Sequence, residues 1–198
     1  MPGEDDSRPG PVEDIAPPGQ IFPHRPRQTP ADPYDFSALV ISTSDLQPPN
    51  KNMSTFVPLI SSGTAGPLGV LHLPRFWLKA SLEARGKLDS RYPGCGKGYD
   101  QMTLDALGLN KDATLAYIKA SRPTYPQFEA WIKKQPGVKL DKASIEKHNA
   151  GVRGYNHDDA TRQGVLKNNG LPDDGSVKDA VRLNDLDSWQ EFHADVLK

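Results

Sequence analysis

The sequence predicts an all-α fold, a compact bundle of short helices preceded by an extended, proline-rich N-terminal arm. Two observations support this prediction. Twelve of the 19 prolines lie between Pro2 and Pro58, and a segment so rich in proline forms neither a long helix nor a central strand. Beyond residue 70, apolar residues recur at helical spacing between residues that cap helices. We therefore expect an arm over residues 1–50 and a helical domain over residues 51–198.

The arm is more acidic than the rest of the chain. Residues 1–35 contain seven acids and three bases, a composition typical of extended or disordered segments. The arm begins Met1-Pro-Gly-Glu-Asp-Asp6, without the basic start and apolar run of a secretory signal, so we expect a cytoplasmic protein. Four apolar residues of the arm are candidate anchors: Ile21, Phe22, Tyr34 and Phe36. They are either scattered residues of a solvated tail or a segment that docks on this domain or on a partner protein.

The first predicted helix runs from about Pro74 to Arg85, because proline suits the first turn of a helix. A loop must follow over residues 92–99, which contain three glycines and a proline. Asp100 is then expected to cap a short helix that ends at Leu107-Gly108. This region should therefore be two helices joined by an irregular loop.

Polar caps divide the C-terminal half into further short helices. Thr124-Tyr-Pro-Gln127 matches a capping box, and Asp187-Ser-Trp-Gln190 is interpreted as another. The expected helices are Asn110 to about Ala120, Thr124 to before Pro136, Asp141 through Ala150, Asn156 to about Asn168, and Asp187 onward, the last with Trp189, Phe192, His193 and Val196 on one face. No alternation of apolar and polar residues is strong enough to predict a sheet.

The composition also limits the function. The chain has 24 basic and 25 acidic side chains and a net charge of −1, so nucleic acid is not an expected partner, since nucleic-acid binders usually carry a basic stripe. No run of about 18 apolar residues predicts a membrane span. The single cysteine excludes a disulfide framework and a multi-cysteine zinc site. We expect no metal and no cofactor.

Several segments, in order, resemble a family of bacterial proteins. The run Leu71–Leu88 contains Leu-Pro-Arg followed by a helix with spaced Lys and Arg, and a loop with Gly, Cys and Tyr follows it. Leu104-Asp-Ala-Leu-Gly-Leu109 and Phe128-Glu-Ala-Trp-Ile132 come next. Together these segments resemble the bacterial domain-of-unknown-function family 5069 over roughly residues 66–155. The resemblance implies a small helical bacterial domain and carries no catalytic residue.

The loop at 91–99 is the first candidate site. Cys95 lies between two glycines, with Arg91 and Lys97 nearby, and neighbouring cations lower the pKa of a thiol. A nucleophilic cysteine also needs a base, and every histidine is distant in sequence. The alternative is a small residue in a tight turn. The glycines do not form a phosphate-binding loop, because the spacing and the hydroxyl after Lys97 are missing.

A second candidate lies at the start of the first helix. His72 and Arg75, with Arg91 and Lys97, could bind a carboxylate or a phosphate. The alternative is that Arg75 pairs with an acid such as Glu83 or Asp89 and that His72 simply packs. The sequence leaves both interpretations open.

A third group surrounds the glycines at 151 and 154. Its polar and aromatic candidates for ligand binding are Asn149, Arg153, Tyr155 and His157. His148 and His157 could reach one metal ion, but their separation is not the one-turn spacing of a helical histidine pair. Any small-molecule site should form where this segment meets residues 72–99.

Taken together, these features favour a soluble bacterial interaction module whose helical body and arm bind a protein partner. The second hypothesis is a small enzyme or ligand sensor with a pocket for a small anionic ligand. That pocket would be built around His72, Arg75, Arg91, Cys95 and Lys97. No catalytic constellation is evident, so the sequence favours binding over catalysis.

Overall fold

The computed structural model describes residues 54–198. Contacts along the chain divide it into two units, Met1–Leu46 and Gln47–Lys198, and all described residues belong to the second unit. The predicted arm and its candidate anchors lie outside the described residues. The extended arm therefore stays a prediction.

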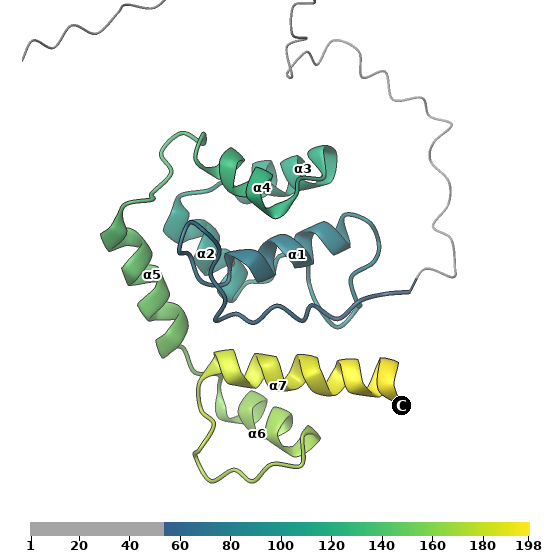
Figure 1. Ribbon diagram of the computed structural model, residues 1–198. Helices are drawn as coiled ribbons and strands as arrows, with labels where there is room; N and C mark the ends of the chain where they lie inside the picture. Colours follow the sequence, from purple (N-terminus) through teal and green to yellow (C-terminus); the bar gives the residue numbers. More distant parts are fainter. Residues whose placement is uncertain (1–53) are drawn as a thin grey trace, which may run out of the picture. The chain divides into compact units, whose positions relative to one another are not determined.

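The described part of the chain is built from helices (Figure 1). They are α1 (Leu73–Glu83), α2 (Tyr99–Leu107), α3 (Lys111–Ser121), α4 (Tyr125–Ile132), α5 (Lys142–Gly154), α6 (Asp159–Asn168) and α7 (Ala180–Phe192), followed by a π-helical turn, His193–Leu197. Residues 54–198 contain isolated β-bridges but no strand. The prediction of an all-α fold is confirmed.

Three of the predicted caps are present. The side chains of Asn110 and Asp141 each accept a hydrogen bond of 2.9 Å from the backbone N–H three residues later. At the start of α4, Gln127 accepts from the N–H of Thr124 at 2.9 Å and completes the capping box. These caps satisfy backbone donors that the first turn of a helix leaves free, which explains why α3, α4 and α5 begin where they do.

Three other predicted helix starts are wrong, for identifiable reasons. Asp100 does not cap α2, which begins one residue earlier, and the carboxylate bonds to other elements instead. Asp158 caps α6 in place of Asn156, accepting from Thr161 N at 2.9 Å. Asp179 caps α7, and this helix passes through Asp187 without interruption. For α6 and α7 the sequence offers two comparable cap residues each, and tertiary contacts select between them.

Helix α5 is longer than predicted. It continues past Ala150, and Gly151 and Gly154 both lie within it. Glycine weakens an isolated helix by only about 1 kcal/mol, and α5 is held by buried Val152 and Asn149. Packing therefore outweighs the two glycines.

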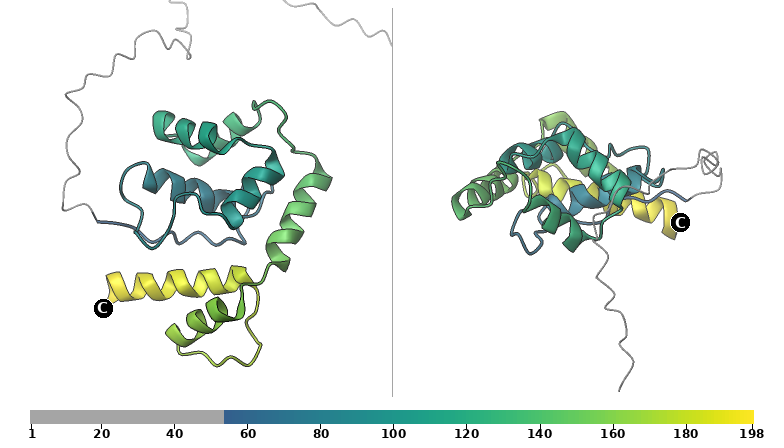
Figure 2. Two further views of the ribbon diagram at one scale, coloured as in Figure 1. Left: turned by 180° about the vertical axis from the view of Figure 1, so that it is seen from behind. Right: turned by 90° about the horizontal axis from the view of Figure 1, so that it is seen from above.

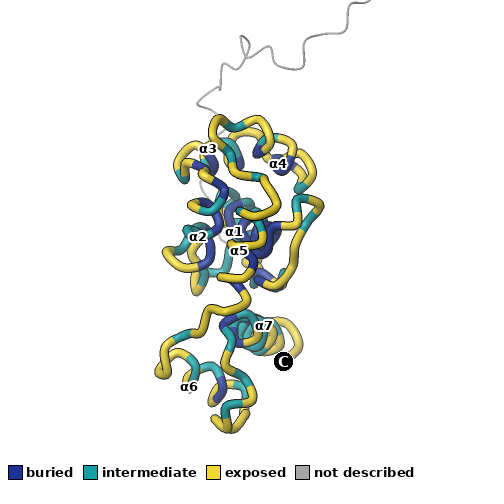
Figure 3. Tube along the Cα trace, turned by 90° about the vertical axis from the view of Figure 1, so that its left-hand side faces the viewer, coloured by how far each residue is buried: buried dark blue, intermediate teal, exposed yellow. Residues whose placement is uncertain are grey.

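Two clusters of buried side chains hold the helices together. The larger cluster joins four helices, α1, α2, α3 and α4. At its centre lie Phe76 and Phe128, whose ring centroids are 6.3 Å apart. The smaller contains Leu71, Tyr99, Val152 and Ala180, from four separate segments. Figure 3 shows buried stretches on α1 and α2 and on the faces of the neighbouring helices that meet them, whereas α6 is largely exposed. The core thus lies on both sides of the segment that leads into α1.

The first part of the irregular segment over residues 54–72 passes between α1 and α7 (Figures 1 and 2). Arg75 of α1 fixes it there, donating hydrogen bonds to the carbonyls of Pro58 and Ile60 and to the hydroxyl of Ser188 in α7. The predicted apolar face of the terminal helix is not buried, since Trp189 is 56% exposed. Buried Ala180 and Leu183, together with the bond from Arg75 to Ser188, attach α7 in place of that tryptophan.

Candidate functional site

One buried carboxylate joins three parts of the domain. His72 Nε2 donates to Asp100 Oδ1 at 2.8 Å, while Lys79 Nζ and the N–H of Gly96 donate to Oδ2 at 2.6 and 2.7 Å. Burial alone raises the pKa of the Asp100 carboxyl, but the hydrogen bond from His72 and the charge of Lys79 outweigh it and lower that pKa. Asp100 is therefore ionised and satisfied on both oxygens.

His72 is held at both ring nitrogens. Because Nε2 donates to a carboxylate, Nδ1 of the neutral ring accepts from the hydroxyl of Ser62 at 3.1 Å. Burial lowers the pKa of His72, which favours this neutral form. The residue precedes α1 with a φ of 67°, in the left-handed region. Such backbone strain persists only where the surroundings fix it, as Ser62 and Asp100 do.

A cavity of about 300 Å³ adjoins this cluster. Its lining residues are His72, Arg75, Lys79, Tyr92, Pro93, Gly96, Lys97, Gly98, Tyr99, Asp100, Tyr155, His157 and Asn184. We call it the Asp100 cavity. Five of the candidates from the sequence, His72, Arg75, Lys97, Tyr155 and His157, line it together. The segment after α5 does meet the region 72–99 here.

The other loop candidates lie outside this cavity. Arg91 forms ion pairs with Asp89 at 2.7 Å, with Asp195 and with Glu191 at 3.6 Å, and its side chain is 40% exposed. Cys95 is partly buried, and burial together with the charge of Asp100 raises its pKa. This shift is opposite to that of an activated thiol and favours the alternative, a small residue in a tight turn.

The contacts of Arg75, Asn149 and Arg153 show which of the roles considered from the sequence each residue has. Arg75 pairs with neither Glu83 nor Asp89, since its donors reach two backbone carbonyls and a hydroxyl. Asn149 is structural, because its amide accepts from Leu71 N at 2.9 Å and donates to Gly69 O at 2.8 Å. Arg153 is exposed on α5 and lines none of the cavities described here.

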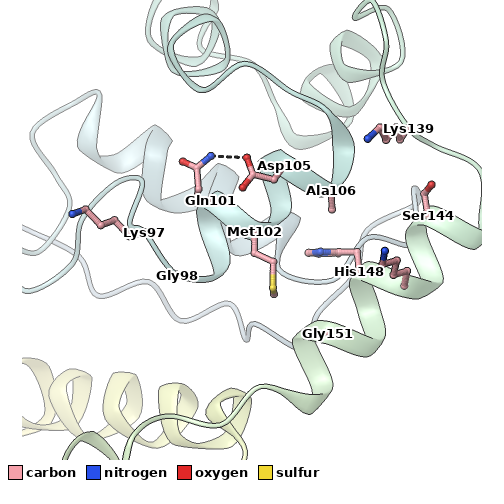
Figure 4. Close-up of a pocket in the computed structure, with 11 residues that line it drawn as sticks. Lys97, Gly98, Gln101, Met102, Asp105, Ala106, Lys139, Ser144, His148 and Gly151 are labelled. Carbon is pink, nitrogen blue, oxygen red and sulfur yellow. Dashed lines mark hydrogen bonds between the residues drawn. The ribbon is translucent and has the colours of Figure 1, made fainter.

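A larger cavity of about 610 Å³ lies between α2 and α5 (Figure 4). We call it the α2–α5 groove. Lys97 and Gly98 line both cavities, so the loop before α2 separates them. His148 lines this groove and His157 the other, so the two histidines do not converge. Within residues 54–198, no group of three or more His, Cys, Asp or Glu side chains could hold a metal ion.

Sequence reasoning missed the acid at the centre and one of its partners. Asp100 looks like a helix cap, so its role in the cluster was not expected. Lys79 lies four residues after Arg75 and seven after His72, which places all three on one side of a helix. That spacing was a usable signal for Lys79, whereas Ser62 and Asn184 carried none.

Comparison with family models, with curated proteins and with solved structures gives no match for this chain. The resemblance to the unknown-function family thus stays a prediction. Among the described residues, no helix is long and apolar enough to cross a membrane.

Proposed function

We propose that the domain binds a small anionic molecule in the Asp100 cavity. The observation that carries this proposal is the balance of charge around it. Arg75 and Lys79 are buried cations and Lys97 is an exposed one, while Asp100 is the one acid that lines the cavity. Asp185 and Asp187 of α7 lie near Arg75 but do not line it. The cavity wall thus favours a negative ligand.

The lining residues divide into fixed charges and available groups. Arg75 and Lys79 already bond to protein oxygens, so they supply a positive field. Lys97 has no ion-pair partner among the described residues and can pair directly with a carboxylate or phosphate. Tyr155 contacts Tyr99 edge to face, with ring centroids 5.5 Å apart, and offers an aromatic wall. A planar carboxylate suits these groups best.

The geometry favours binding over catalysis. Ser62, His72 and Asp100 are the residue types of a hydrolytic triad. Ser62 is fully buried, however, and its hydroxyl serves as a hydrogen-bond donor to His72. A nucleophile must be reached by its substrate, so this cluster is better suited to holding the cavity wall in place.

Titration of the full chain with benzoate and with inorganic phosphate, followed by NMR, tests the proposal. We expect shifts at residues 97, 155 and 157, and Tyr155→Ala should weaken benzoate binding about tenfold because it removes the aromatic wall. Lys133→Gln, an exposed lysine at the end of α4, is the matched control for charge. Equal affinity of Tyr155→Ala and the unaltered chain would overturn the assignment.

A second candidate function is docking of a protein partner, as part of a cytoplasmic bacterial interaction module. An apolar groove of about 460 Å³ supports it, formed by the segment before α1 and by α1 itself. Its lining residues are Phe56, Val57, Leu59, Ile60, Leu78 and Leu82. Leu59→Glu should abolish capture of a specific partner, whereas Tyr155→Ala should leave it unchanged. Capture that survives Leu59→Glu would exclude this surface.

A further inference from the structure

His148 is a buried histidine with one unused nitrogen. Its residue is 6% exposed, and Nε2 lies 3.1 Å from the carbonyl oxygen of Leu71. A carbonyl only accepts, so Nε2 carries the proton and Nδ1 presents a lone pair. Nδ1 has no hydrogen-bond partner among the described residues. Buried polar atoms are almost always paired, so this one points to a missing donor.

His148 also lines the largest cavity described here. Figure 4 shows the imidazole of His148 projecting from α5 toward Met102 of α2, within the α2–α5 groove. Met102, Ala106 and Gly151 provide an apolar floor. A volume of about 610 Å³ falls within the ordinary range for small-molecule sites.

The rim of the groove is positively charged. Lys97, Lys139 and Lys147 line it and form no ion pair among the described residues. The acid in the lining, Asp105, already accepts from Gln101 Nε2 at 2.8 Å. The rim thus offers an anionic group lysines without an ion pair within residues 54–198, spread along the groove, whereas its carboxylate is engaged with Gln101.

We infer that the α2–α5 groove is a second ligand site, selective for a small aromatic acid that carries a hydroxyl or amino group. The ring covers Met102, the N–H or O–H donates to His148 Nδ1, and the anionic group pairs with the lysines. This recognition differs from that of the Asp100 cavity, where no unpaired buried acceptor is found among the described lining residues, although Lys97 lines both cavities. The groove therefore selects ligands that carry a hydrogen-bond donor for His148 as well as a negative charge for the lysines.

Three probes separate the two requirements. We expect 4-hydroxybenzoate to bind the full chain about fivefold more tightly than 4-methoxybenzoate, which cannot donate, and 4-hydroxybenzyl alcohol to bind weakly because it lacks the charge. Calorimetry gives the affinities. Long-range proton–nitrogen NMR should show the Nδ1 resonance of His148 moving with 4-hydroxybenzoate and remaining in place with the methoxy compound.

Substitutions then test whether 4-hydroxybenzoate binds in the α2–α5 groove. Lys147→Gln, on the exposed rim, should weaken 4-hydroxybenzoate about threefold, and Lys133→Gln should not. His148→Gln keeps a donor for Leu71 O and should remove the preference for the hydroxyl. Tyr155 lines the Asp100 cavity but not the α2–α5 groove. Tyr155→Ala therefore tests the first site without affecting the second, and the failure of one proposal can be told from the failure of the other. Equal affinities for the hydroxy and methoxy compounds, or an Nδ1 resonance that does not respond, would overturn the inference.

Discussion

The two buried histidines of this domain differ in one hydrogen bond. His72 and His148 are both neutral and both donate through Nε2 to a protein oxygen. Nδ1 of His72 accepts from Ser62, whereas Nδ1 of His148 has no partner among the described residues. A satisfied ring fixes the structure around it, and an unsatisfied one leaves an acceptor for a ligand. Similar burial therefore supports two different roles.

Loss of the central carboxylate should break the satisfied cluster. Asp100→Ala leaves Lys79 buried without its counter-charge, and His72 without its acceptor. Breaking a buried pair in this way costs about 3–5 kcal/mol, measured as the free energy of unfolding in urea. Asp105→Ala is the control, because that exposed acid bonds only to Gln101 and should cost about 0.5 kcal/mol or less. Equal losses for both variants would contradict a central role for Asp100.

Removal of one hydroxyl should make His72 resemble His148. Ser62→Ala leaves Nδ1 of His72 without a donor at a site that is fully buried. We expect a loss of about 1–2 kcal/mol in unfolding free energy. Ser144→Ala removes an exposed hydroxyl and is the matched control. An unchanged stability would mean that the bond from Ser62 contributes little.

The pH dependence of stability should report the neutral histidines. Burial lowers the pKa of His72 and His148 below the usual histidine value of 6.5. Their contribution is therefore complete above pH 6.5 and is lost as the pH falls below it, by at most about 1.4 kcal/mol per pH unit for each ring. Burial raises the pKa of Asp185, Asp187 and Glu191, which oppose this loss by taking up protons in the folded state.

His148→Gln isolates the contribution of His148 to the pH dependence of stability. It removes a single titrating ring and leaves the opposing carboxyls in place. The slope of unfolding free energy between pH 6.5 and 5 should become shallower than in the unaltered chain. A slope that does not change would show that His148 is protonated equally in the folded and unfolded chain.

The smallest expected effect concerns the thiol in the loop between the two cavities. Burial and the nearby charge of Asp100 raise the pKa of Cys95, and the thiolate is the reactive form. Alkylation by iodoacetamide at pH 8 should be slower in the folded protein than in the chain unfolded with urea. A faster reaction in the fold would restore the idea of an activated cysteine.

The helices followed from the sequence wherever local chemistry decides them. Asn110 and the Thr124–Gln127 capping box act within one turn, so the residues alone identify α3 and α4. The start of α7 did not follow, because Asp179 and Asp187 are equally good caps. Only the attachment of α7 to the segment before α1 distinguishes them.

The candidate site residues likewise divide into those that local sequence identifies and those that only tertiary contacts reveal. His72, Arg75 and Lys97 were identifiable as basic residue types near a helix start or in the glycine loop, and the structure places them around one cavity. Asp100 was not identifiable, since an acid in the first turn of a helix has a sufficient local explanation. Nor was the groove at His148, which requires knowing that α2 and α5 lie side by side.

The left-handed backbone at His72 restricts what can replace it. Glycine suits a φ of 67°, and asparagine tolerates it, but neither carries an imidazole that can join Ser62 to Asp100. Other residues with large side chains would also strain the backbone at this φ, and none of them carries an imidazole. In a saturation library, position 72 should therefore retain histidine, because no other amino acid meets the conformational and the chemical demand together.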